Sequence, residues 1–187
     1  MTRHLDFTEL SAGIADIGKS PRDSGVLRMI VIRPRGNKRQ VVDMCGISLA
    51  GGLDGDNWAK GCWKSTTGGE PHPDVQVCIM NARVIDLVAD RMRDNWAPAG
   101  DSLFIDLDLS QENLPTGQRL AIGKAIIEIT AEPHNGCAKF TKRYGRDATI
   151  FVNHKDYRHL RLRGVYARVV RDGQVAAGDR IVKGASP

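Results

Sequence analysis

The sequence predicts a mostly β fold, a β-barrel or sandwich with helical insertions, built as one domain. A chain of 187 residues is long enough for one well-buried core and too short for two. Its 20 glycines and 8 prolines indicate many turns. Several short apolar stretches are separated by turn residues, and a single segment has clear helical periodicity.

The first part of the chain divides into an arm and the start of the domain. Residues 1–24 show no clear periodicity, and we interpret them as an N-terminal arm without chemistry. The domain then spans residues 25–187. V-L-R-M-I-V-I, 26–32, is the first predicted strand, and Q-V-V-D-M, 40–44, follows a polar turn as its hairpin partner. The glycine-rich passage L-A-G-G-L-D-G-D-N-W, 49–58, suits a tight loop.

The middle of the chain contains the helix with the clearest periodicity. Residues 62–74 are almost all loop formers, and V-Q-V-C-I-M, 75–80, is a short buried strand. Asn81 is a predicted N-cap for the helix that follows. The apolar residues of this helix share one face at helical spacing: Val84, Leu87, Val88 and Met92.

The second half of the chain is predicted to form further strands. L-F-I-D-L-D-L, 103–109, alternates as a half-buried strand does. L-A-I-G-K-A-I-I-E-I-T, 120–130, is predicted to be one strand that is broken or bulged at Gly123. Residues 164–182 form a closing run of short strands joined by the turns D-G and G-D.

Charge is distributed unevenly. The net charge is +5, and ten lysines and arginines lie between Lys139 and Arg171, against only Asp147 and Asp156. This cluster favours an anionic ligand, such as the phosphate groups of a cofactor or of nucleic acid. The alternative is a solvated basic face.

The N-terminus has no apolar signal region, and no run approaches the roughly 18 apolar residues of a membrane helix. We therefore expect a cytoplasmic protein without membrane contact. In that setting the four cysteines are expected to be reduced thiols. None lies in a C-x-x-C pair, and the ligand spacing argues against structural zinc.

The stretch E-P-H-N-G-C-A-K-F-T-K-R-Y-G, 132–145, places Cys137 after a turn and before three cations. Phe140 and Tyr144 are spaced i,i+4, so Cys137 is predicted to open a helix. Amide dipoles and nearby cations would hold its thiol pKa below the usual value of about 8.5. Such a sulfur could attack an electrophile, carry sulfur or bind a soft metal.

The four cysteines have different expected roles. The alternative for Cys137 is a buried, inert thiol, which is the common fate of a lone cysteine. Cys78 has apolar neighbours on both sides and is assigned to the core, while Cys45 and Cys62 stay undecided. His134, three residues before Cys137, is a candidate catalytic base, with a solvated loop histidine as the alternative.

Several motifs, in this order, resemble the MOSC family, named after the C-terminal domain of molybdenum cofactor sulfurases. The resemblance extends over residues 26–183. It is carried by G-L-D-G-D at 52–56, V-Q-V-C-I-M-N at 75–81, L-A-I-G-K-A-I-I-E-I-T at 120–130, C-A-K-F-T-K-R-Y-G at 137–145 and G-V-Y-A-R-V-V-R-D-G-Q-V-A-A-G-D-R-I at 164–181.

The resemblance implies a β-barrel-like fold in which Cys137 carries persulfide sulfur or binds the molybdenum of a pterin cofactor, molybdopterin. Both roles suit a soft thiolate. The resemblance also supplies candidate cofactor contacts, of which the cations would meet the pterin phosphate: Asp56, Lys139, Lys142, Arg143 and Arg168. Some relatives use such a centre to reduce N-hydroxylated compounds.

The chain departs from the family pattern at two motifs. Relatives often have G-D-R-H where this chain has G-D-N-W at 55–58, so only Asp56 is carried over. Where many relatives have G-E-N-L, this chain has G-D-S-L at 100–103. The aminotransferase-like domain of the large sulfurases is also missing. Any link to pyridoxal phosphate is therefore expected through a partner enzyme.

The sequence thus predicts a stand-alone MOSC-like protein that acts in sulfur transfer or as a molybdenum-dependent oxidoreductase. Its expected partners are a cysteine desulfurase-type sulfur donor and an electron-transfer protein. The alternative from another class is a small basic β-barrel that binds nucleic acid, with few stacking residues because aromatic content is 5%. The aromatic residues that lie among the cations are Tyr144, Phe151, Tyr157 and Tyr166.

Overall fold

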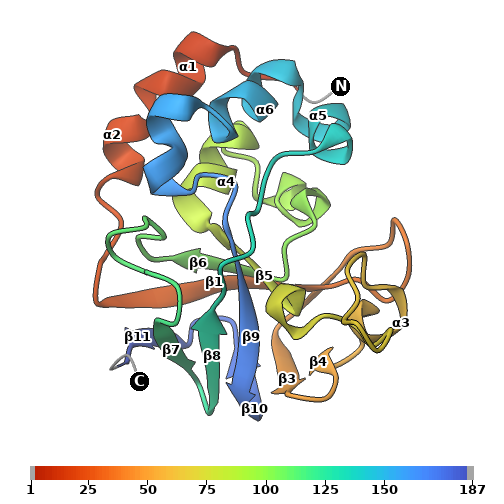
Figure 1. Cartoon of the computed structure of the whole chain (residues 1–187). Helices are drawn as coiled ribbons and strands as arrows, with labels where there is room; N and C mark the ends of the chain where they lie inside the picture. The colour runs from red at the N-terminus through yellow and green to blue at the C-terminus, as the bar shows by residue number, and fades with distance from the viewer. Residues whose placement is uncertain (1–2, 185–187) are drawn as a thin grey trace.

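The computed structural model describes residues 3–184, and their main body is a closed β-barrel (Figure 1). Seven strands follow one another around it in the order β11, β7, β8, β9, β5, β6, β1, and pairing of β11 with β1 closes the circle. Neighbours are antiparallel except β5 and β6, which are parallel. The predicted barrel is confirmed. Its strands are β1 (Ser24–Ile32), β5 (Val77–Asn81), β6 (Leu103–Asp106), β7 (Arg119–Ile122), β8 (Ala125–Ile129), β9 (Val165–Arg171) and β11 (Arg180–Lys183).

Four short strands lie outside the closed circle. β2 (Gln40–Val42) pairs with the end of β1, which confirms the predicted hairpin partner. β10 (Gly173–Ala176), β3 (Met44–Ser48) and β4 (Gly52–Leu53) form a separate three-stranded sheet.

The barrel interior is filled with aliphatic side chains. The apolar face predicted for 103–109 is confirmed, because its leucine and isoleucine side chains are at most 2% exposed. The strand itself ends at Asp106 and is not half-buried, because Phe104 on the other face is also fully buried. Asp106 lies on the opposite side, where Arg83 and Arg28 pair with its carboxylate. Burial of a well-packed aliphatic core supplies most of the driving force for such a fold.

Helices cover one end of the barrel, at the top of Figure 1, and bury a second apolar cluster. These helices are α1 (Phe7–Ala12), α2 (Ile14–Ile17), α4 (Ala82–Val88), α5 (Ala138–Tyr144) and α6 (Arg146–Val152). α3 (Trp58–Gly61) lies apart from them, beside β4. Short 3₁₀ turns lie in the segments that lead from helices to the next strand: η1 (Pro73–Val75), η2 (Arg93–Asn95), η3 (Ala97–Ala99) and η4 (Lys155–Leu160).

The predicted N-cap of α4 is confirmed. Asn81 Oδ1 accepts hydrogen bonds from the backbone N–H groups of Arg83 and Val84, at 2.7 and 3.2 Å. The helix ends earlier than predicted, because Asp90 and Arg91 adopt left-handed backbone conformations with φ of 52° and 62°. Met92 therefore lies beyond the helix and is 53% exposed.

The break predicted at Gly123 is confirmed, but the segment forms two strands and not one. The chain reverses at Gly123 and Lys124, and β7 and β8 pair as an antiparallel hairpin. Both strands are apolar, so the pattern alone could not separate a bulge from a turn.

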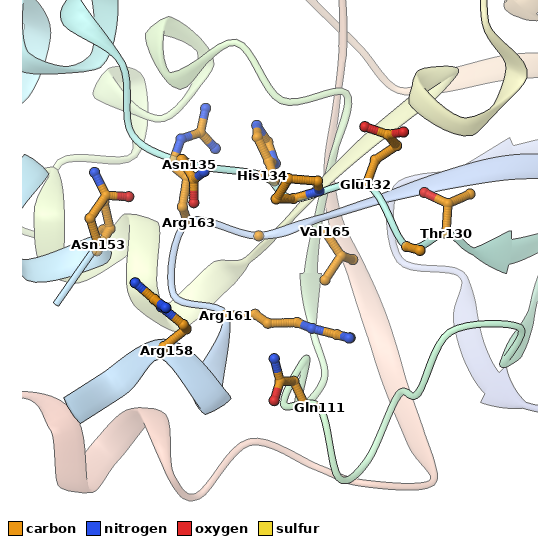
Figure 2. A pocket seen from close by; sticks show the side chains of 14 residues that line it. Gln111, Thr130, Glu132, His134, Asn135, Asn153, Arg158, Arg161, Arg163 and Val165 are labelled. Carbon is orange, nitrogen blue, oxygen red and sulfur yellow. The ribbon is translucent and has the colours of Figure 1, made fainter. Parts of the chain in front are cut away.

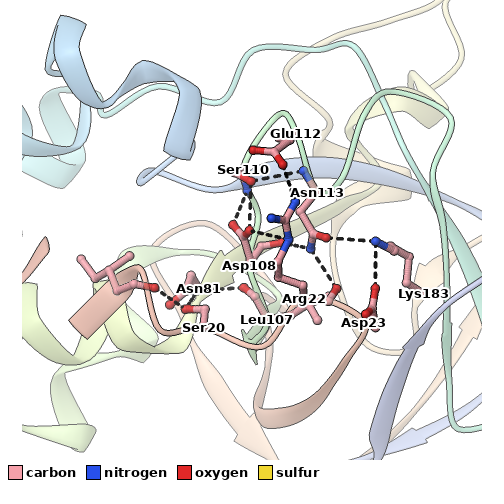
Figure 3. Close-up of polar contacts among 11 residues, drawn as sticks. Ser20, Arg22, Asp23, Asn81, Leu107, Asp108, Ser110, Glu112, Asn113 and Lys183 are labelled. Atoms are coloured by element: carbon pink, nitrogen blue, oxygen red, sulfur yellow. Dashed lines mark hydrogen bonds and ion pairs between the residues drawn. The ribbon is translucent and has the colours of Figure 1, made fainter. Parts of the chain in front are cut away.

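The N-terminal arm packs against the domain. Leu10 of α1 is fully buried in the helical cluster. A polar network ties the end of the arm to the loop after β6 (Figure 3). Asn81 Nδ2 donates to Ser20 Oγ at 2.8 Å, and Asn113 Nδ2 donates to the carbonyl oxygen of Arg22 at 2.9 Å. The arm is thus fixed by side chains from two distant segments.

None of the helices formed by residues 3–184 combines the length and apolar character that crossing a membrane requires.

Candidate functional site

Cys137 lies at the N-cap of α5, with extended backbone angles of φ −118° and ψ 175°, and is exposed. The predicted helix start is confirmed. Phe140 and Tyr144 bury the inner face of this helix, with ring centroids 4.8 Å apart. The Tyr144 hydroxyl donates to the carbonyl oxygen of Asn95 at 2.6 Å, which fixes the helix against η2.

The segment before Cys137 is fixed by Asn153, the C-cap residue of α6. Gly136 N–H donates to Asn153 Oδ1 at 2.8 Å, and Asn153 Nδ2 donates to the Gly136 carbonyl oxygen at 3.2 Å. A Cβ atom on Gly136 would come within 3.0 Å of Asn153 Nδ2 and 3.1 Å of Val152. The close approach favours glycine directly before the thiol.

The pKa of the Cys137 thiol is lowered from its ordinary value. Partial burial acts to raise it, but the backbone amides of Phe140 and Lys139 and the charges of Arg163 and Arg143 act more strongly in the other direction. Lys139 and Phe140 lie in the first turn of α5, where the backbone N–H groups favour a negative charge on the sulfur. The result is a reachable sulfur that loses its proton more easily than an ordinary thiol.

A buried ion pair lies behind the thiol. Arg163 Nη1 donates to both carboxylate oxygens of Asp101, at 2.9 and 2.8 Å. Both side chains are almost fully buried, and the guanidinium carbon lies 4.9 Å from the centroid of the Phe140 ring. Burial alone would lower the pKa of Arg163, but the Asp101 carboxylate raises it, so the arginine stays charged.

His134 is buried beside this pair. Its Nδ1 lies 3.7 Å from Asp101 Oδ1, too far for a hydrogen bond, and has no hydrogen-bonding partner among residues 3–184. Its ring stacks on Tyr166 with centroids 4.3 Å apart. Burial and then the positive charges of Arg163 and Arg33 hold its pKa well below the usual value. The imidazole is therefore neutral at physiological pH and a weak base.

Arg39 and Arg143 lie beside Gly100 and form a cationic rim. Gly100 has a left-handed backbone conformation with φ of 90°. A Cβ atom on Gly100 would lie 3.2 Å from Arg39 Nη2 and 3.7 Å from Arg143 Nη1. Burial, followed by the charges of Arg143 and Arg33, lowers the pKa of Arg39. Arg39 Nε is buried without a hydrogen-bonding partner among the residues described. The rim thus has spare donors and excess positive charge.

Asp56 is fully engaged within the chain. Its carboxylate accepts from Arg33 Nε and Nη2, at 2.8 and 2.9 Å, and from the backbone N–H of Trp58, at 2.9 Å. Only 1% of its side chain is exposed. Asp56 therefore orients Arg33, whose Nη1 lies 3.7 Å from the Cys78 sulfur.

The other predicted cofactor contacts differ in position. Arg143 is the one that acts on both the thiol and the rim. Lys139 and Lys142 are exposed on α5. Arg168, on β9, pairs with Glu128 and Asp74, so carboxylates already balance its charge.

The assignment of Cys78 to the core is confirmed. Cys78 is 6% exposed and packs with Val75 and Tyr166, and burial raises its thiol pKa. Cys45 is also buried, while Cys62 is partly exposed and packs against the cluster around Cys78. Residues 3–184 contain no group of three or more His, Cys, Asp or Glu side chains that could hold a metal ion.

Sequence reasoning missed the groups that surround the thiol from far along the chain. Arg163 and Asp101 are 62 residues apart, and Asn153 follows Gly136 by 17. One signal was available for Arg163, since a charged residue stood between Leu162 and Gly164 at the entry to an apolar strand. Such a charge needs a buried partner, but the pattern does not identify which.

Comparison with known proteins identifies both the fold and the family. The MOSC domain model matches residues 64–182. YuaD from Bacillus subtilis superposes with a TM-score of 0.57 and 18% identity, covering 87% of this chain and 97% of YuaD. YiiM from Escherichia coli gives a TM-score of 0.54 and 19% identity, covering 86% of this chain and 70% of YiiM.

A second YiiM, from Geobacillus stearothermophilus, gives a TM-score of 0.52 and 16% identity, covering 88% and 74% of the two chains. No curated protein gave a significant match. At these identities the solved structures establish the shared fold alone. The match to the domain model covers more than half of the sequence, and the chain therefore belongs to the MOSC family.

Proposed function

We propose that the protein acts through the Cys137 thiolate, which either ligates the molybdenum of a pterin cofactor or carries a sulfane sulfur. The observation that carries this proposal is an exposed thiol with a lowered pKa, placed beside the charges of Arg163 and Arg143. A soft, anionic sulfur suits both a molybdenum centre and a sulfane sulfur atom.

The residues around Cys137 fit the pterin cofactor. Its phosphate would supply acceptors for the buried Arg39 Nε, which lacks a partner among the residues described, and for Arg143. When bound, the cofactor would supply a metal that exchanges electrons with a substrate. The Cys137 sulfur would hold the metal, and the arginines would orient the phosphate. The exposed Lys139 and Lys142 would add favourable charge.

His134 would have a positioning role in this arrangement. A neutral, buried imidazole can donate or accept one hydrogen bond, but its lowered pKa makes it a poor general base near neutral pH. Its contacts with Tyr166 and its closeness to Asp101 hold the ring in place.

The sulfur-carrier alternative uses the same thiolate. The Cys137 thiolate would attack the outer sulfur of a persulfide on a cysteine desulfurase-type donor, so that the donor's S–S bond breaks, its thiolate leaves and Cys137 holds the sulfur as a persulfide. In that case pyridoxal phosphate would belong to the donor. In the cofactor alternative, the candidate reaction is reduction of N-hydroxylated compounds with electrons from a partner protein. This reaction is suggested by the family resemblance alone.

The geometry gives little support to the nucleic-acid alternative. Of the aromatic residues that lie among the cations, Tyr144, Phe151 and Tyr166 are buried and offer no exposed face to a base.

Mass spectrometry of the anaerobically purified protein, with metal and pterin analysis, tests the proposal. We expect either stoichiometric molybdenum with pterin, or added sulfur on Cys137, and loss of both in Cys137→Ala. Cys62→Ala is the matched control, because Cys62 is the other thiol that is not fully buried. Equal loading of the protein and its Cys137→Ala variant would overturn the proposal.

A further inference from the structure

A pocket of about 650 Å³ lies behind the Cys137 segment, within the size range of small-molecule sites. Its walls are two stretches of chain, 130–135 and 158–165, together with Val152 and Asn153 of the α6 end and Gln111 (Figure 2). Asn135 lines the pocket, and Cys137 follows two residues later. Asn153, which holds Gly136, lines it as well.

Arginines dominate the charge of the pocket. Arg158, Arg161 and Arg163 line it, and Glu132 is its one carboxylate. Arg163 is balanced by Asp101, and Glu132 by Lys64. These pairs leave Arg158 and Arg161 as the unbalanced charges.

The unbalanced arginines have little else to bind. Within residues 3–184, the exposed Arg158 side chain has no hydrogen-bonding or ion-pair partner. Arg161 Nη1 donates to the carbonyl oxygen of Leu114 at 2.6 Å, a neutral partner. Burial lowers the pKa of Arg161, and no carboxylate offsets that effect. A partly buried guanidinium without a counter-ion favours an anionic ligand.

Neutral polar groups complete the lining. Figure 2 shows Gln111 near Arg161, with Asn135 on the other side of the view. Neither side-chain amide has a hydrogen-bonding partner within the described part of the chain. His134 also lines the pocket, with Nδ1 unpaired. The site therefore combines two spare cations with spare neutral hydrogen-bonding groups, as small-molecule sites do.

We infer that this pocket binds a small molecule whose phosphate or carboxylate group is attracted by the unbalanced charges of Arg158 and Arg161. The anionic group would lie near these arginines, and Gln111, His134 and Asn135 would offer hydrogen bonds to the rest of the molecule.

Calorimetry with defined probes tests the inference. Phenyl phosphate and benzoate separate the two oxyanions, and benzyl alcohol is their neutral counterpart. Titrations use the Cys137→Ala protein, so that the result does not depend on what the thiol carries. We expect saturable binding of at least one anionic probe, no binding of benzyl alcohol, and weaker binding at higher salt.

Matched charge variants locate the binding. Arg158→Gln removes an exposed side chain, and we expect about tenfold weaker binding, as for one lost charge-assisted hydrogen bond. Arg158→Gln/Arg161→Gln should abolish it. The control is Arg146→Gln, an exposed arginine on α6 that does not line the pocket, and binding should stay unchanged.

Three outcomes would overturn the inference: no saturable binding of either anionic probe, benzyl alcohol binding as well as the anions, or Arg146→Gln weakening binding as much as Arg158→Gln. Failure of the proposed function looks different, since Cys137 would then carry neither molybdenum nor sulfur while the pocket still bound its probe. Conversely, a loaded Cys137 with no anion binding would remove only the pocket inference.

Discussion

Cys78 and Cys137 lie in parts of the molecule that shift the pKa of a thiol in opposite directions. Cys78 is on β5 and 6% exposed, packed with Val75 and Tyr166 and facing Arg33, and burial raises its pKa. Cys137 starts a helix at the surface, and amides and arginines lower its pKa. The charge of Arg163 lowers the pKa of both thiols, so a nearby cation alone does not explain the difference between them. Exposure of the sulfur to solvent and to helix amides makes the difference.

The largest expected effect comes from the ion pair behind both thiols. Arg163→Met leaves the Asp101 carboxylate buried without its counter-ion, which should lower the free energy of unfolding by about 3–5 kcal/mol. Urea denaturation measures it.

The double variant Arg163→Met/Asp101→Leu is the control for that change. It removes both charges, so we expect it to recover most of the lost stability. A single-variant loss below about 1 kcal/mol would mean that the pair behaves like a surface salt bridge.

The sequence predicted what depends on local patterns. Phe140 and Tyr144 at helical spacing gave α5, the apolar neighbours of Cys78 gave its burial, and Asn81 gave a cap. These features depend on residues a few positions apart. The sequence-based prediction of the thiol site was therefore correct in where the helix starts.

Features made by distant residues could not be predicted. Two ion pairs join segments that only the folded chain brings together: Asp101 with Arg163, and Asp56 with Arg33. Helix α1 is six residues long, and such short helices owe their stability to tertiary packing. The ion-pair partners of Arg168 could not be recognised in the sequence, because Glu128 and Asp74 are 40 and 94 residues away.

A second, smaller effect compares the thiols directly. Cys78→Ser replaces a buried thiol that packs with Val75 and Tyr166 by a smaller, more polar group, and it should lower the free energy of unfolding by about 1–3 kcal/mol. Cys137→Ser changes an exposed side chain and should stay within about 0.5 kcal/mol of the parent. Thermal or urea unfolding compares them, and equal losses would contradict the contrast in burial.

The smallest expected effect separates two arginines. Arg143→Gln removes a charge that lowers the Cys137 pKa, so the pKa should rise by less than about one unit and alkylation at pH 7 should slow a few-fold. Arg168→Gln is the control, because Glu128 and Asp74 already balance that charge. Equal slowing in both variants would argue for general surface charge instead of a local contact.

The central claim is that the Cys137 sulfur is both reachable and more easily deprotonated than an ordinary thiol. The most direct test is the pH dependence of iodoacetamide labelling, with each cysteine identified by peptide mass spectrometry. Because the thiolate is the nucleophile, labelling rises with pH and levels off above the pKa. We predict that Cys137 labels first, with a midpoint below the unperturbed value of about 8.5, while Cys78 stays protected until the chain unfolds. A Cys137 midpoint at or above that value, or labelling no faster than that of Cys78, would contradict the account.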